Sequence, residues 1–384
     1  MINSGYSISS DVTDAVTKTA QQMFPGGVIP VIDFCYVFYS FEGNVQETLI
    51  NQFRRVFQPN EMICVPSNKL IYNNSLFDSG ICVVTFSEVE TRSSGFFHEE
   101  DVPEQTEKYI WRMSKGVSRM RKLFLGFSLL KEDALSEHLK GLEQSVGRRS
   151  VMLNLYNLRR ENKPCHPFYF NSNAFDGGAM GTFFYDPHEC VVKTGSGFNP
   201  IGRPVTIEVD KDNPRIVTRI DDVTAVDYYK KFFDDSFAAD CSSCRQVFDR
   251  YPLGFKKTQY LYDIYYATKI LPGGEIEFLQ EIEAKKARMM IPTTDGLLTE
   301  VRSVAVQSER LSSEYNTVLF FDTINRYKFF GQHYKKQIDA IKEAAPGADF
   351  VGGLFDGFIS MFDPEQPELG HGINSFGFAM VSFG

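Results

Sequence analysis

The chain has 384 residues, 43% of them hydrophobic and 23% charged, a composition typical of globular domains and long enough for two or three of them. The net charge of −9 argues against a nucleic-acid partner, because binding phosphates needs a basic surface. No stretch approaches about 18 continuous apolar residues, and the N-terminus lacks the layout of a signal peptide. We therefore expect a cytoplasmic protein that does not bind membranes.

The aromatic content and the cysteines are the unusual parts of the composition. The chain holds 35 Phe and 18 Tyr against one Trp, which predicts a Phe-rich core or, alternatively, the lining of an apolar pocket. The 7 Cys lie mostly among apolar neighbours, as reduced and buried thiols do. Cys241 and Cys244 form the one close pair, and either structural chance or a redox or metal role would explain it.

The N-terminal region predicts a strand–helix–strand–strand unit. An amphipathic helix is expected over residues 1–27, with Asp11 as its N-cap. The unit itself follows as a strand at 31–39, a helix at 45–57, and strands at 62–65 and 80–86.

The middle of the chain predicts two helices and then a set of short strands. A helix that starts at Asp101 with Pro103 in its first turn is expected to run to about Phe124, and a second covers 132–146. Short strands separated by Gly- and Pro-rich turns indicate an antiparallel region, and they lie at 151–158, 182–185, 191–194, 205–209 and 216–220. After a short helix at 224–233, the polar stretch 234–244 predicts a boundary between domains 1–233 and 245–384.

The last seventy or so residues repeat the N-terminal order. A strand, a polar turn, a helix and two strands are expected at 317–321, 322–326, 331–344, 350–354 and 376–383. The recurrence indicates duplication, with chance convergence on a common motif as the alternative. The predicted fold class is therefore mixed α/β (α+β), with two pseudo-symmetric halves and a central, mainly antiparallel β region.

The motif inventory favours a protein that is not an enzyme. The sequence has no Walker A loop and no G-x-S-x-G elbow, and His98-Glu99-Glu100 lacks the second His of an H-E-x-x-H zinc motif.

Several stretches resemble one known family. Residues 315–326 are similar to a strand and "C-x-x-R" turn, 350–359 to a "G-F-x-x-x-G-E-I" segment, and Asn374-Ser375 to an "H-N-x-T" ending. Residues 177–204, 221–232 and 251–254 resemble its central motifs, so the chain resembles a stand-alone member of the FIST (F-box and intracellular signal transduction) family over essentially its whole length. Two departures stand out: the family's glutamate is missing from 356–359, and His371 is displaced from the position before Asn374.

The resemblance implies a sensory domain that binds a small ligand, with amino acids among those proposed for the family. Such domains act on a histidine kinase, a cyclic-dinucleotide enzyme or a chemoreceptor, and some stand-alone bacterial members bind haem and sense nitric oxide. Because no kinase segment is recognisable here, the protein is expected to signal through a separate partner.

The candidate ligand-binding residues are polar groups at strand ends and turns: Asn325, Arg326, Asp356 and Asn374 near the C-terminus, with Asp176 and Arg203 from the middle. An arginine could hold a ligand carboxylate with two parallel hydrogen bonds, although a plain ion pair is the alternative. In a haem-based nitric-oxide sensor, His371 would be the axial ligand. A protein-interaction scaffold with a vestigial pocket is the third hypothesis.

Overall fold

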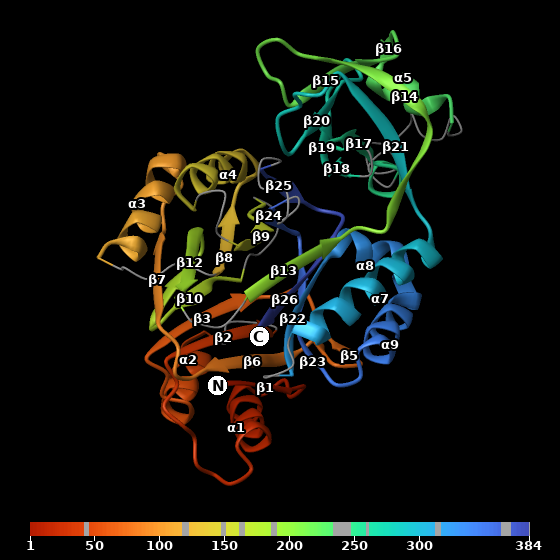
Figure 1. Cartoon of the computed structure of the whole chain (residues 1–384). Helices are drawn as coiled ribbons and strands as arrows, with labels where there is room; N and C mark the ends of the chain where they lie inside the picture. The colour runs from red at the N-terminus through yellow and green to blue at the C-terminus, as the bar shows by residue number, and fades with distance from the viewer. Residues whose placement is uncertain are drawn as a thin grey trace.

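Three copies of one strand-and-helix unit, together with an inserted antiparallel domain, make up the computed structural model (Figure 1). It describes residues 1–41, 46–116, 123–146, 151–160, 166–185, 190–232, 247–258, 261–311, 316–361 and 370–383.

The first unit ends at residue 86. Its elements are β1 (Ile2–Ser7), α1 (Val12–Met23), β2 (Phe34–Ser40), α2 (Gln46–Val56), β3 (Glu61–Pro66), the hairpin β4 (Leu70–Tyr72) and β5 (Ser75–Phe77), and β6 (Gly80–Phe86). Strands β2 and β3 are parallel, and the crossover helix α2 connects them. Strand β6 lies between β2 and β1 and is antiparallel to both.

The second unit repeats this order. Its elements are β7 (Thr91–Phe96), α3 (Val102–Ser114), β8 (Leu123–Leu130), α4 (Glu132–Val146), β9 (Val151–Leu158), the hairpin β10 (Phe168–Phe170) and β11 (Asn173–Phe175), and β12 (Gly178–Phe184). Strands β8 and β9 are parallel, and β12 lies antiparallel between β8 and β7.

The third unit has the same pairing, interrupted by the inserted domain after its first strand. Its elements are β13 (Cys190–Gly195), α7 (Thr294–Leu311), β22 (Thr317–Thr323), α8 (Ile324–Phe330), the 3-10 turn η2 (Gly331–His333), α9 (Tyr334–Ala344), β23 (Asp349–Phe355), the hairpin β24 (Gly357–Met361) and β25 (His371–Asn374), and β26 (Phe378–Phe383). Strands β22 and β23 are parallel, and β26 lies between β22 and β13.

The hairpin of each unit pairs with a strand in the sheet of another unit. Strand β4 of the first unit pairs with β23 of the third, β24 of the third with β9 of the second, and β10 of the second with β3 of the first. The exchange closes a ring of three six-stranded sheets with pseudo-threefold symmetry.

The inner faces of the three sheets meet in one apolar core, and a pair of helices covers each sheet from outside (Figure 1). In β2, Phe34, Tyr36 and Phe38 point to this core, whereas Cys35 and Val37 pack with α1 and α2. Because both faces are buried, these strands read as continuous apolar runs rather than as alternating ones.

Three phenylalanines mark the pseudo-threefold relation. Phe86, Phe184 and Phe383 are the last residues of β6, β12 and β26. Their ring centroids lie 5.1, 5.4 and 6.2 Å apart, so each ring contacts the other two. The predicted Phe-rich core is confirmed.

Two glycines hold equivalent positions at the first residues of β6 and β12. Gly80 has a φ of +130°, and a Cβ there would lie 1.9 Å from the Ser7 carbonyl oxygen. Gly178 has a φ of +111°, and its Cβ would lie 2.1 Å from the Phe96 carbonyl oxygen. In both units only glycine allows the end of the outer strand to approach this closely.

The inserted domain is antiparallel throughout, and of the strands predicted for the central antiparallel region only 205–209 and 216–220 lie in it. Its elements are β14 (Phe198–Val209), β15 (Ile216–Ile220), β16 (Val223–Thr224), α5 (Ala225–Lys230), β17 (Leu253–Lys256), β18 (Tyr262–Tyr265), β19 (Ala267–Ile270), β20 (Ile276–Phe278) and β21 (Lys286–Pro292). Every pairing among these strands is antiparallel, and β14 and β21 connect the domain to the body (Figure 1).

The mixed α/β class and the unit near each end are confirmed, and a third unit lies between them. The helix over 1–27 was wrong at its start, because residues 2–7 form β1; Asp11 is the N-cap, as predicted. The helix expected to reach Phe124 ends at Ser114, and Leu123 and Phe124 begin β8. The turn at 322–326 is instead the end of β22 and the start of α8.

Two further predictions concern the antiparallel region and the domain boundary. Strand β9 pairs in parallel with β8, so residues 151–158 do not belong to the antiparallel region. The strands predicted at 182–185 and 191–194 fall instead at β12 and β13, in the sheets of the second and third units. The boundary at 234–244, with Cys241 and Cys244, lies outside the described residues; β14 and β21, from either side of it, pair in one sheet.

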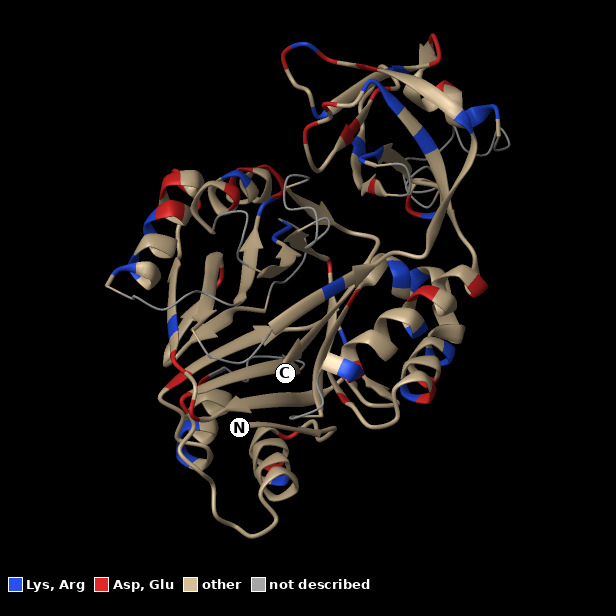
Figure 2. Cartoon of the chain, viewed as in Figure 1, with Lys and Arg blue, Asp and Glu red and all other residues tan. Residues whose placement is uncertain are grey.

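Charged side chains gather on the helices and the inserted domain, whereas the strands of the body carry few (Figure 2). None of the helices in the described ranges is long and apolar enough to cross a membrane.

Candidate functional site

A cavity of about 550 Å³ lies where the inserted domain meets the third unit. Its walls come from the turn between β13 and β14, the first turns of α7, strand β18 and the hairpin β24–β25. The described residues that line it are Thr194, Gly195, Ser196, Gly197, Phe198, Asn199, Pro200, Leu261, Tyr262, Asp263, Ile264, Met290, Asp295, Gly296, Thr299, Glu300, Ser360, Met361, Gly372, Ile373 and Asn374. Segments far apart in the sequence therefore build one site.

A glycine brings the β13–β14 turn against the start of α7. Gly197 has a φ of +72°, and a Cβ there would lie 2.7 Å from the Leu297 Cα. Gly195 is also tight, because its Cβ would meet both the Glu300 side chain and the Phe378 ring at 2.8 Å. These contacts place Glu300 beside the turn, at the wall of the cavity.

The lining combines apolar walls with hydrogen-bonding groups. Phe198, Ile264, Met290 and Ile373 supply apolar surface. Polar side chains alternate with them, contributed by Thr194, Ser196, Asn199, Asp263, Asp295, Thr299, Glu300, Ser360 and Asn374. This mixture is typical of sites for small organic molecules.

Asp263 is a buried carboxyl group on β18. Burial raises the pKa of Asp263 to about 7, although Lys257 and Gln280 act in the opposite direction. Gln280 Nε2 donates to Asp263 Oδ2 at 3.1 Å, and Lys257 Nζ lies 4.0 Å from the same oxygen. Asp263 therefore changes protonation state near neutral pH, at the edge of the cavity.

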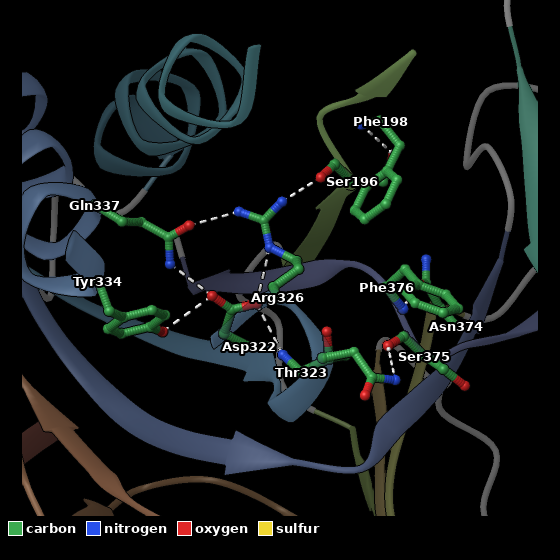
Figure 3. Close-up of polar contacts among 11 residues, drawn as sticks. Ser196, Phe198, Asp322, Thr323, Arg326, Tyr334, Gln337, Asn374, Ser375 and Phe376 are labelled. Atoms are coloured by element: carbon green, nitrogen blue, oxygen red, sulfur yellow. Dashed lines mark hydrogen bonds and ion pairs between the residues drawn. The ribbon is translucent and has the colours of Figure 1, made fainter. Parts of the chain in front are cut away.

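Arg326 lies behind the cavity wall and is fully buried together with Asp322 (Figure 3). Its Nε donates to Asp322 Oδ1 at 2.9 Å, and one terminal nitrogen donates to Gln337 Oε1 at 2.5 Å. The other terminal nitrogen donates to the backbone carbonyl of Ser196 in the lining turn. The guanidinium carbon also lies 4.8 Å from the centroid of the Phe378 ring. Arg326 thus binds protein groups and supports the cavity wall from behind.

Asp322 accepts hydrogen bonds from several sides. Besides Arg326, it receives the Thr323 backbone N–H at 2.8 Å, the Tyr334 hydroxyl at 2.9 Å and Gln337 Nε2 at 2.5 Å (Figure 3). The ion pair is thereby satisfied on both sides and joins β22 to α9.

The predicted asparagines lie close together. Asn374 lines the cavity, and its Oδ1 accepts the Phe376 backbone N–H at 3.1 Å. Asn325 is 6% exposed, and its Nδ2 donates to the Ser375 carbonyl at 3.1 Å. The structure therefore brings Asn325, Arg326 and Asn374 to one region, and of these Asn374 lines the cavity.

Three other predicted residues lie elsewhere. Asp356 accepts the Leu158 backbone N–H at 2.8 Å, at the contact between the second and third units. Arg203 is on the inserted domain with its side chain 75% exposed, and it pairs with Asp221 at 2.6 Å. Asp176 lines a second cavity of about 580 Å³ beside the start of α4, together with acidic and basic side chains such as Glu99 and Arg159.

His371, the predicted haem ligand, is buried on β25. Its backbone N–H donates to Glu143 Oε1 at 3.1 Å, and its ring Nδ1 lies 3.9 Å from the same oxygen. It is not among the described residues that line either cavity. Over the described ranges, no three His, Cys, Asp or Glu side chains form a group that could hold a metal ion.

Sequence reasoning missed the wall that the inserted domain and α7 contribute. Asp263 was detectable, because an acidic residue inside the aromatic run 261–266 is unusual unless it has a partner or a role. Glu300 and Thr299 carry no such signal, since acidic and hydroxyl residues are common on helix surfaces.

No protein-family model matches the chain, and no curated protein matches its sequence. The resemblance to FIST domains stays a prediction.

Proposed function

We propose that the protein is a small-molecule-binding sensory protein of the cytoplasm, with the ligand held in the cavity between the third unit and the inserted domain. The observation that carries the proposal is the cavity itself, which has apolar walls, several hydrogen-bonding side chains and a volume of about 550 Å³. Cavities of this size at the contact between two domains are a common location for small-molecule sites.

The position of the cavity also supports a sensory role. The described connection between the inserted domain and the third unit runs through β14 and β21, whose register shifts between Ile201 and Val205. Gly202, within this irregular stretch, has a φ of +66°. A ligand that touches β18 on one side and β25 on the other favours the arrangement in which both walls are in place. A change in this arrangement is the signal that a separate partner, such as a histidine kinase or a cyclic-dinucleotide enzyme, would read.

The proposal is tested by thermal unfolding against a panel of metabolites. A ligand that binds the folded state must raise the melting temperature. Thr299 lies on the exposed surface of α7 and lines the cavity, so Thr299→Trp fills the site without disturbing the core. Thr17 is an exposed threonine on α1, and Thr17→Trp is the matched control.

We expect at least one compound to stabilise the wild type and Thr17→Trp but not Thr299→Trp. A panel without any stabilising compound would favour an interaction scaffold with a vestigial pocket. Added haemin belongs in the same panel, because a Soret band that survives in Thr299→Trp and is lost in His371→Ala would place a haem outside the cavity.

A further inference from the structure

The ionisable acid and base side chains among the described residues that line the cavity are all acidic, and the nearby Lys257 lies beside Asp263. Asp263, Asp295 and Glu300 line the cavity, and among its described lining residues there is no lysine, arginine or histidine. Arg326, which donates to the Ser196 carbonyl in the wall, is fully buried and also donates to Asp322 and Gln337.

These facts reverse the expectation that an arginine holds a ligand carboxylate. Arg326 forms an ion pair with Asp322, and Arg203 forms an ion pair with Asp221 within the inserted domain. A carboxylate in this cavity would meet Glu300 and Asp295 with no cation among the described lining residues, which costs free energy in a partly enclosed site.

The uncharged polar lining fits the same conclusion. Ionised carboxylates only accept hydrogen bonds, and hydroxyl groups can accept as well as donate. Thr194, Ser360 and Thr299 add hydroxyl oxygens to the carboxylates of Asp295 and Glu300. Beside the amide groups of Asn199 and Asn374, the cavity therefore offers carboxylate and hydroxyl acceptors, which suit a ligand that presents N–H donors.

We infer that the cavity takes a small organic ligand that carries an ammonium group, with Glu300 as its principal counter-charge and Asp295 as a second one. The inference rests on the proposed function and specifies its ligand class. Glu300 is half-buried and packs beside Gly195 in the lining turn, whereas Asp295 is exposed at the start of α7. A charge-assisted hydrogen bond to a partly buried carboxylate is stronger than one at an open surface.

The test uses two probes of equal chain length and opposite charge, 1,4-diaminobutane and succinate. Calorimetric titration of the wild type should detect binding of the diamine and not of the dicarboxylate. Glu300→Gln should weaken diamine binding by roughly tenfold to a hundredfold, because one charge-assisted hydrogen bond is lost. Affinity should also fall as salt is raised, because the ions screen the attraction.

Glu107, an exposed glutamate on α3, provides the control variant Glu107→Gln, which should bind the diamine like the wild type. Succinate binding without diamine binding would overturn the inference, as would diamine binding that both Glu300→Gln and Asp295→Asn leave unchanged. If neither probe binds but a neutral compound binds and Thr299→Trp abolishes it, the ligand class is wrong and the proposed function stands. If no compound binds at all, both fail.

Discussion

Arg326 and Asp322 form an ion pair in which both side chains are fully buried, with Nε and Oδ1 2.9 Å apart. Such a pair is a weak source of net stability, because removing two charges from water costs about as much as their attraction returns. Its location indicates that the pair positions a part of the cavity wall. Through the Ser196 carbonyl and Gln337, the pair fixes the turn that lines the cavity relative to α9 (Figure 3).

The first prediction separates the pair from its single members. Arg326→Met should lower the free energy of unfolding by about 3–5 kcal/mol, because Asp322 would keep a buried charge without its cation. The double variant Arg326→Met with Asp322→Asn removes both charges and should recover most of that loss. Urea unfolding measures both values. Equal destabilisation in the single and double variants would show that the unpaired charge of Asp322 is not the cause of the lost stability.

The second prediction concerns Asp263. Its pKa is raised from 3.8 to about 7 by burial, so the folded state binds the proton more tightly than the unfolded state. The stability from this group is fully present below pH 3.8 and is lost as the pH rises through about 7. Asp263→Asn should therefore be more stable than the wild type at pH 9, by up to about 4 kcal/mol, and similar to it at pH 4. A difference between the two proteins that does not change from pH 4 to pH 9 would contradict this account.

The third prediction concerns His138, which is fully buried in α4 with a ring nitrogen 2.8 Å from the Thr106 hydroxyl. Burial lowers its pKa from 6.5 to about 3, so the unfolded state binds the proton more tightly. Its contribution is present above pH 6.5 and is lost as the pH falls toward about 3. Between pH 7 and pH 4.5 the wild type should lose about 3 kcal/mol more than His138→Gln, as measured by urea unfolding at both pH values. Parallel losses would show that His138 does not titrate in this way.

The fourth prediction tests the pseudo-threefold core. Replacing Phe86, Phe184 or Phe383 by alanine should cost about 3–5 kcal/mol each, because every ring is buried against the other two. Phe232 is 59% exposed, so Phe232→Ala should change stability by less than about 1 kcal/mol. The double variant of Phe86 and Phe184 should deviate from additivity, since the two rings share one contact. Strict additivity would argue against a common cluster.

The sequence predicted the units at both ends because their strands are separated by clear helices and turns. The middle unit stayed hidden, because β8 is buried on both faces and its apolar run shows no period-2 alternation that would separate it from the helix before it. The exchange of hairpins between units could not be predicted from the sequence either, since it depends on pairing between strands as far apart in the chain as β4 and β23.

The site was predicted in part. Asn374 and Arg326 were named as polar residues at strand ends and turns that also fall in the motifs of the family resemblance; the structure places both near the cavity, the arginine behind its wall. The opposite wall, with Asp263 and Glu300, comes from the inserted domain and α7. Only the three-dimensional arrangement brings these segments to Asn374.

The most direct test of a ligand in this cavity is a crystal structure of the protein with the compound that stabilises it most. The account predicts density for the compound between β18 and β25, in contact with Glu300 and Asn374, and the Arg326–Asp322 pair intact behind it. Density for the compound at the second cavity beside Asp176, or elsewhere on the surface with this cavity filled only by water, would contradict it.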